Sequence, residues 1–191
     1  MNILIAGDSF AADWAVKYPN KQGWPNMLSS AYTVFNVAEA GVSEYKILKQ
    51  LEQFNDISVF DCVIVSHTCF SRVHTLRHPF LHKDPLHYNC DLIFSDVYNK
   101  QKLNESMKAA WGYFKYHWDI AYYRDIYRLF RDKIDNLVSD VSKVIHINNF
   151  EPLQTDVSYR YLLADYSGDI NHFNHKGNCI IYEDILNRLT Y

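Results

Sequence analysis

The sequence predicts an α/β fold, a three-layer α/β/α sandwich around a mostly parallel central sheet. Two observations favour it. Short, continuous apolar runs are typical of strands whose two faces are both covered. These runs alternate along the chain with segments of helical spacing. The length of 191 residues fits a single domain, residues 1–191, built on one such sheet.

Four segments have the character of strands. Residues 2–6 form an apolar run that ends at Gly7, and residues 32–37 are rich in β-branched and aromatic side chains. Residues 61–66 hold a continuous apolar run, and residues 143–147 are the fourth candidate. We expect the first and third of these to be fully buried.

Helical spacing follows each of the early strands. Residues 24–30 carry a proline in their first turn, and Ser43 stands as a candidate N-cap for a helix over residues 43–54. Residues 178–189 keep their apolar side chains on roughly one face, which predicts a closing helix. Residues 105–137 step mostly by three or four and predict one long helix or two short ones.

The segment from residue 72 to residue 137 is an aromatic-rich insert or lid after the third strand. Its first part is rich in histidine, proline and aromatic residues and shows no period. Its later rings could pack the insert onto the sheet or could stack on sugar faces. These rings are Trp111, Tyr113, Tyr116, Trp118, Tyr122, Tyr123 and Tyr127. Arg72 could hold a substrate carboxylate or phosphate, or could form a structural ion pair.

Composition excludes several classes of protein. The chain has 19 basic and 22 acidic residues, a formal net charge of −3, so no strong field favours nucleic acid. No stretch approaches the ~20 apolar residues of a membrane span. The N-terminus lacks the basic region of a secretory signal. We therefore expect a soluble, cytoplasmic protein. Its four cysteines form no CxxC pair, and we expect them to be free thiols.

No cofactor or metal is expected. His74, His78 and His82 step by four, which on a helix would place three imidazoles on one face. Pro79 interrupts that helix, and no cysteine or carboxylate pattern completes a ligand set. These histidines are better interpreted as solvated or capping side chains.

A candidate nucleophile follows the first strand, in Gly7-Asp8-Ser9-Phe10. Ligands of parallel α/β folds bind beyond the carboxyl ends of the strands, where this serine would lie. Turn chemistry alone also favours Gly, Asp and Ser. A serine hydroxyl becomes a nucleophile only when a base accepts its proton.

A candidate base lies near the other end of the chain, where Asp169 precedes His172 by three residues. The carboxylate could bond Nδ1 of the imidazole, fix its tautomer and stabilise the imidazolium. Nε2 would then be left to accept a proton from serine. An aspartate and a histidine are also common on surface loops, so this pair is only suggestive by itself.

Together the two motifs resemble those of the SGNH hydrolases, also called the GDSL esterase/lipase family. The segment from Asp169 to Gly177 is similar to the family's DxxH-x-N-x-x-G ending, with Asn174 in place. The resemblance implies a flavodoxin-like SGNH fold, Ser9 as nucleophile, and Asp169 and His172 as its partners.

Two further positions enter through the resemblance. It implies that Gly41 lends its backbone N–H to the oxyanion, a role that needs close approach of the backbone. The family commonly has an asparagine after the third strand, and here Thr68 occupies that position, with His67 as an alternative donor. The sequence therefore departs from the family pattern in its third block.

Three functions remain open at this point. A serine esterase would hydrolyse small acyl esters, with O-acetylated carbohydrate as the preferred substrate class. An acyltransferase would use the same triad and pass the acyl group to an alcohol. A non-catalytic carbohydrate-binding or assembly module could use the same fold without chemistry, and the altered third block favours it.

Overall fold

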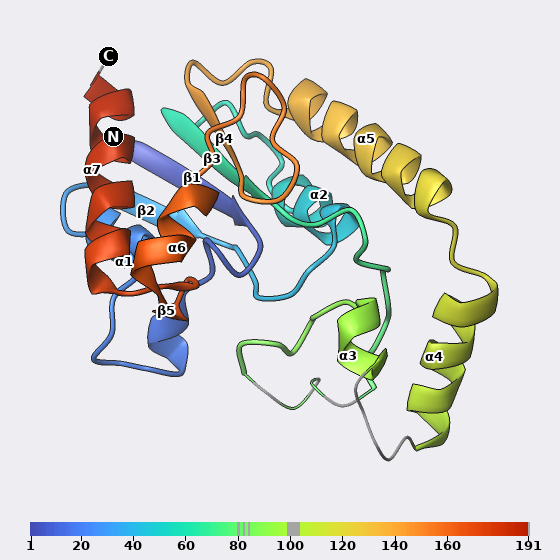
Figure 1. Ribbon diagram of the computed structural model, residues 1–191. Helices are drawn as coiled ribbons and strands as arrows, with labels where there is room; N and C mark the ends of the chain where they lie inside the picture. The colour runs from blue at the N-terminus through green and yellow to red at the C-terminus, as the bar shows by residue number, and fades with distance from the viewer. Residues whose placement is uncertain (80, 82, 84, 99–103, 191) are drawn as a thin grey trace.

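The sheet is parallel and follows the predicted strands. The computed structural model describes residues 1–79, 81, 83, 85–98 and 104–190, with Asp169 described by its backbone alone. The strands are β1 (Asn2–Gly7), β2 (Thr33–Asn36), β3 (Cys62–His67) and β4 (Val144–Asn148). They lie in the order β2-β1-β3-β4, with every neighbouring pair parallel (Figure 1). This confirms the predicted sheet.

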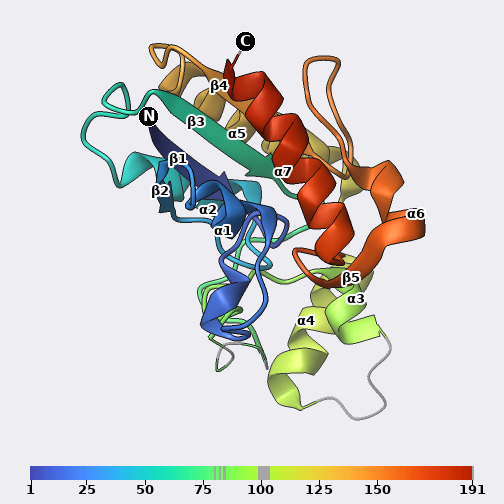
Figure 2. The same ribbon diagram turned by 90° about the vertical axis from the view of Figure 1, so that its left-hand side faces the viewer.

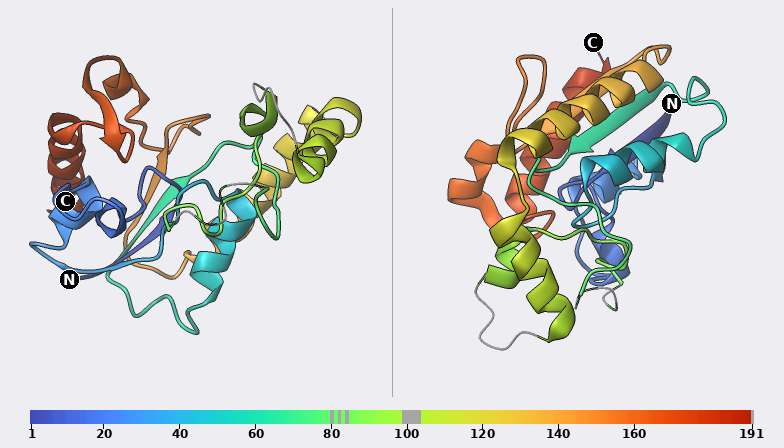
Figure 3. Two further views of the ribbon diagram at one scale, coloured as in Figure 1. Left: turned by 90° about the horizontal axis from the view of Figure 1, so that it is seen from below. Right: turned by 90° about the vertical axis from the view of Figure 1, so that its right-hand side faces the viewer.

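Helices cover both faces of the sheet, which confirms the α/β fold class. Alternate strand residues face opposite sides, so one face presents Ile3, Ile5 and Ile64 and the other Leu4, Val63 and Val65. The first face packs against α1 (Trp24–Leu28) and α7 (His175–Thr190). The second packs against α2 (Glu44–Glu52) and α5 (Ile120–Leu137). Figure 3 shows the sheet between these two layers.

The periodic segment over residues 105–137 forms two helices, α4 (Glu105–Tyr116) and α5. The break has a local cause. His117 ends α4, and the Asp119 carboxylate accepts from the backbone N–H groups of Ala121 and Tyr122 to begin α5. Continuous apolar spacing therefore did not reveal the N-cap that separates the two helices.

Five short elements were not predicted from the sequence, because each is too brief to show a period. They lie between the longer elements and shape the loops around the sheet. They are η1 (Trp14–Val16), α3 (Phe94–Tyr98), η2 (Arg160–Leu162), α6 (Leu163–Tyr166) and β5 (Ser167–Ile170).

The insert between β3 and β4 lies beyond the carboxyl ends of the strands in its first part, where α3 and α4 are found (Figures 1 and 2). Trp111, Tyr113 and Trp118 pack around a small apolar cluster formed by Val97, Phe114 and their neighbours. These three rings are therefore used in packing the insert, whereas Tyr116 and Tyr122 are exposed.

The described residues also bear on the metal and membrane expectations. His78 bonds the Asp96 carboxylate at 3.0 Å, and His74 lies 3.4 Å from Asp91, whereas His82 is outside the described residues. Within the described ranges, no group of three or more His, Cys, Asp or Glu side chains could hold a metal ion. No described helix is long and apolar enough to cross a membrane. The four cysteines are free.

Asn178 ties the last helix to the loop before it. Its amide oxygen accepts from the Trp24 N–H at 3.0 Å. Its amide nitrogen donates to the carbonyls of Ile170, Phe173 and Asn174, each at 3.1 Å. Since Asn178 is fully buried, water cannot replace these bonds.

We expect Asn178→Ala to lower the free energy of unfolding by roughly 2 to 4 kcal/mol, because it leaves several buried backbone groups unbonded. Chemical denaturation monitored by circular dichroism measures the change. Asn187→Ala, on the exposed face of the same helix, is the matched control and should stay within about 0.5 kcal/mol of the natural protein. Equal effects of the two changes would contradict the role given to Asn178.

Candidate active site

Ser9 lies in a tight turn directly after β1. The Asp8 carboxylate shapes this turn by accepting from the Phe10 N–H at 3.0 Å and from the Ser66 hydroxyl at 3.1 Å. The carbonyl of Ser9 accepts from the Trp14 indole N–H at 3.0 Å. The nucleophile candidate therefore lies at the carboxyl end of a central strand, with its backbone fixed on both sides.

His172 is presented by a loop with unusual backbone angles. Asn171 and His172 have φ angles of 48° and 63°, in the left-handed region that non-glycine residues rarely adopt. The Asn171 amide donates to the carbonyl of Ala12 at 2.9 Å and to that of Ser9 at 3.3 Å. These bonds join the end of the chain to its beginning and hold the loop in its strained form.

The two loops bring Ser9 and His172 into contact. Nε2 of His172 lies 2.8 Å from the Ser9 hydroxyl oxygen. The imidazole is flanked by Phe10, at 4.5 Å between ring centroids, and by Trp14, at 6.0 Å. Nδ1 has no hydrogen-bond partner among the side chains that the structure describes. The predicted partner, Asp169, has its backbone in β5, and its side chain lies outside the described residues.

The surroundings of His172 favour its neutral form. Burial of the imidazole lowers its pKa below the usual 6.5, and the positive charge of Arg72 lowers it further. A neutral imidazole can accept a proton, so at neutral pH the ring is in the form that a general base requires.

Ser9 and His172 open onto a small pocket of about 130 Å³. Gly41 lines it with a φ of 76°, and a side chain there would meet Cys90 at 2.9 Å. Neither the Ser9 N–H nor the Gly41 N–H donates a hydrogen bond to any described residue. The pocket is lined by Ser9, Trp14, Gly41, Arg72, Leu81, His87, Cys90, Asp91, Asp96 and His172. It therefore holds a hydroxyl, an imidazole and two residues with unbonded backbone N–H groups.

The other predicted residues of the third block, Thr68 and His67, are not among those that line this pocket. The Thr68 hydroxyl is buried and makes no hydrogen bond to the described residues, while its backbone N–H donates to Glu44 at 3.3 Å. Both ring nitrogens of His67 are occupied, by Glu44 at 2.5 Å and by His146 at 2.9 Å. The structure thus brings together Ser9, His172 and Gly41 but leaves Thr68 aside.

A buried row of polar side chains runs away from the pocket and was missed from the sequence. It passes from Glu44 through His67 to His146, whose Nε2 lies 3.6 Å from the Asp135 carboxylate. Burial lowers the pKa of His146 to about 3, and the neighbouring His67 adds to this effect. The row ties α2, β3, β4 and α5 together and accounts for His67 without a role in the pocket.

Asp91 was also missed, because a single aspartate in an aperiodic segment carries no signal. It is fully buried. Its carboxylate accepts from the Ser43 N–H at 2.8 Å and the Thr75 N–H at 2.7 Å, and pairs with Lys46 at 2.8 Å. Its own N–H donates to the carbonyl of Gly41 at 2.8 Å. The insert is therefore fastened to the loop that carries Gly41.

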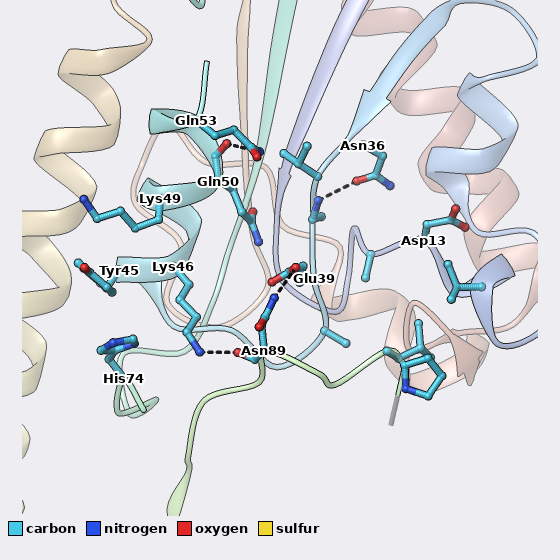
Figure 4. A pocket seen from close by; sticks show the side chains of 17 residues that line it. Asp13, Asn36, Glu39, Tyr45, Lys46, Lys49, Gln50, Gln53, His74 and Asn89 are labelled. Atoms are coloured by element: carbon cyan, nitrogen blue, oxygen red, sulfur yellow. Dashed lines mark hydrogen bonds between the residues drawn. The ribbon is translucent and has the colours of Figure 1, made fainter. Parts of the chain in front are cut away.

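A larger groove of about 740 Å³ lies beside the pocket (Figure 4). Helix α2 contributes one wall, with Lys46, Lys49 and Gln50 among its side chains, and residues 36–40 contribute another. Asn89 connects these two walls, bonded to Glu39 at 2.9 Å and to Lys46. Ala40 and Asn89 line the groove. The residue that follows each of them, Gly41 or Cys90, lines the pocket. The two cavities therefore lie next to each other along the same two segments.

Comparison with known proteins adds little to this geometry. No family model matches the chain, and no curated protein matches it. Among solved structures, the chain is similar to a Bacteroides fragilis protein described as a "putative acylhydrolase", with 10% identity and a TM-score of 0.43. The match covers 99% of this chain and 86% of the other. At this distance it carries no argument about activity, so the functional argument comes from the site alone.

The carboxyl group of Asp8 has a shifted pKa, which makes the stability of the protein depend on pH. Burial of its carboxyl group raises its pKa from 3.8 to about 7, against the hydrogen bond from Phe10 and the positive charge of Arg72. Between about pH 4 and pH 7 the folded protein therefore keeps a proton that the unfolded chain has released. By linkage, this group makes the protein less stable as the pH rises through that window.

We expect Asp8→Asn to remove this loss of stability, because asparagine keeps the acceptor oxygen and does not ionise. The difference between the variant and the natural protein should grow from pH 4 to pH 7 by up to about 4 kcal/mol. Denaturant unfolding at several pH values measures it. The exposed control Asp140→Asn should keep the natural slope, and an unchanged slope in Asp8→Asn would contradict the prediction.

Proposed function

We propose that this protein is a serine esterase that hydrolyses small acyl esters through Ser9, His172 and Asp169. The observation that supports it most is the 2.8 Å separation between Nε2 of His172 and the Ser9 hydroxyl. The two groups come from residues 163 positions apart and meet in a pocket that Gly41 also lines. The backbone N–H groups of Ser9 and Gly41 bond no residue that the structure describes.

The reaction would proceed through an acyl-enzyme. The Ser9 hydroxyl oxygen bonds to the ester carbonyl carbon, and its proton passes to Nε2 of His172. The carbonyl electron pair moves onto oxygen, where the N–H groups of Ser9 and Gly41 would stabilise it. Collapse of this intermediate expels the alcohol, which takes the proton from His172. Water then repeats the sequence in the second half and releases the acid.

Asp169 would complete the triad. Because Nδ1 of His172 is unbonded within the described side chains, it has a hydrogen bond to offer. The short connection along β5 keeps the aspartate near the imidazole. Its carboxylate would orient the ring and stabilise the imidazolium formed in each half-reaction.

The size and surroundings of the pocket support a particular substrate class. A volume of about 130 Å³ suits an acetyl group or another short acyl chain. The adjacent groove is lined by asparagine, glutamine, tyrosine and lysine side chains, which suit the hydroxyl groups of a sugar. We therefore propose O-acetylated carbohydrate as the substrate. Product analysis with a supplied alcohol would reveal whether the acyl group goes to that alcohol instead of water.

We expect Ser9→Ala to abolish hydrolysis of 4-nitrophenyl acetate and labelling by a fluorophosphonate, because both reactions need the serine nucleophile. The loss of rate should be about 10⁴-fold or more while the fold remains intact. Ser139→Ala, at an exposed serine, is the matched control. Full activity of Ser9→Ala, or a natural protein that is neither active nor labelled, would reject the proposal.

The titration of His172 also predicts how the rate of ester hydrolysis falls at acidic pH. Only neutral His172 can act as the base, and its pKa lies below the usual 6.5 because of burial and the charge of Arg72. The value of kcat/KM for 4-nitrophenyl acetate should therefore reach half its maximum below pH 6.5. NMR titration of the His172 imidazole should give the same midpoint. A midpoint above pH 7 in both measurements would contradict the lowered pKa of His172.

A further inference from the structure

Two residues that line this pocket, Ser9 and Gly41, offer backbone N–H groups to an oxyanion. Ser9 and Gly41 each have an N–H that bonds no described residue. The side-chain donor expected from the sequence is not in the pocket. Both nitrogens of His67 are engaged, and the Thr68 hydroxyl is not part of the lining. The charged and polar side chains that line the pocket are therefore the remaining candidates for a further donor.

Arg72 is placed to be that donor. It lines the same pocket as Ser9 and His172, and its Nη1 lies 3.6 Å from the point where a Cβ on Gly41 would stand. The guanidinium is therefore in close contact with the glycine whose N–H would meet the oxyanion.

Most of the hydrogen-bonding capacity of Arg72 is unused. Its guanidinium donates to one described acceptor, the carbonyl of Asp91, at 3.2 Å. Nε is buried without a partner among the described residues, and no described carboxylate lies within ion-pair distance. A guanidinium has five N–H donors, so a charged side chain held in a pocket with so few partners is suited to an anionic ligand.

The position of Arg72 is fixed by the same residue that fixes Gly41. The Asp91 carbonyl accepts from Nη1 of Arg72, while the Asp91 N–H donates to the Gly41 carbonyl at 2.8 Å. Asp91 is itself fully buried and paired with Lys46. The separation between the guanidinium and the glycine loop is therefore set by a rigid buried link, as electrostatic stabilisation of a transition state requires.

We propose that Arg72 is a catalytic residue whose guanidinium donates to the oxyanion of the tetrahedral intermediate, beside the N–H groups of Ser9 and Gly41. This inference rests on the proposed esterase function. As Ser9 bonds to the carbonyl carbon and its proton moves to His172, the electron pair of the C=O bond moves to oxygen. The new negative charge meets the Arg72 cation, and it returns to the C=O bond when the alcohol leaves. No further reactant is needed.

The test uses a neutral ester, 4-nitrophenyl acetate, with Arg72→Met and Arg72→Lys. Arg72→Met keeps the length of the side chain and removes its donors, so kcat should fall about 100- to 1,000-fold with a much smaller change in KM. Arg72→Lys keeps the charge and should retain more of the rate. Arg77→Met, at an exposed arginine in the same insert, is the matched control and should keep the natural kcat.

Two outcomes would overturn the inference while the esterase remains established by Ser9→Ala. One is a natural kcat in Arg72→Met with the neutral ester. The other is an effect confined to KM of an anionic ester such as 4-nitrophenyl hemisuccinate, because Arg72 would then bind a substrate carboxylate. Should Arg72→Met not fold by circular dichroism, Arg72→Gln, a second uncharged replacement, takes its place: a kcat reduced for both esters supports the inference, and an unchanged kcat overturns it.

Discussion

The amide of Asn171 is the link on which the geometry of the site depends. It reaches from the loop before the last helix to the carbonyls of Ser9 and Ala12, at the turn after the first strand. Asn178 anchors the same loop from behind through the carbonyls of Ile170 and Phe173. These buried bonds hold two residues at positive φ, a conformation that would relax if the amides were lost. The contact between imidazole and hydroxyl therefore depends on packing that lies outside the chemistry itself.

A second network positions the insert against the loop that carries Gly41. Buried Asp91 gathers the start of α2, the glycine loop and the insert around one carboxylate. Behind it, Glu44, His67 and His146 join the layers of the sandwich through bonded ring nitrogens. Charged and polar groups in these positions are tolerated because almost all of them are paired. Asp91 thus restrains residues that line the pocket, whereas the row from Glu44 to His146 joins the layers of the sandwich away from the pocket lining.

The sheet could be predicted because a buried strand leaves a local signal in the sequence, a short continuous run of apolar residues. Residues such as Val63, Ile64 and Val65 can only be covered on both faces, so their run identifies a central strand. Ser9 and His172 could be proposed because their two short motifs together resemble those of a known family, and the role of Gly41 came from that resemblance alone. Thr68 shows the limit of that reasoning: its position along the chain follows the motif, but its hydroxyl is not part of the pocket lining. The sequence indicates Arg72 as a possible anion ligand, but whether a described carboxylate pairs with it depends on tertiary contacts that no local pattern records.

The division of the pocket between sheet and insert has a consequence for how such a protein could change over time. Ser9 and Gly41 belong to the turns of the scaffold, whereas Arg72, His87 and Cys90 belong to a segment that leaves the sheet after β3. A graft of that segment onto a related scaffold would carry the guanidinium with it but would lose its register unless the buried aspartate and its lysine partner on α2 travelled together. The insert with Asp91 and the helix with Lys46 would therefore have to be inherited together. Recombination between distant homologues should be tolerated only at junctions that keep Lys46 and Asp91 within one exchanged block.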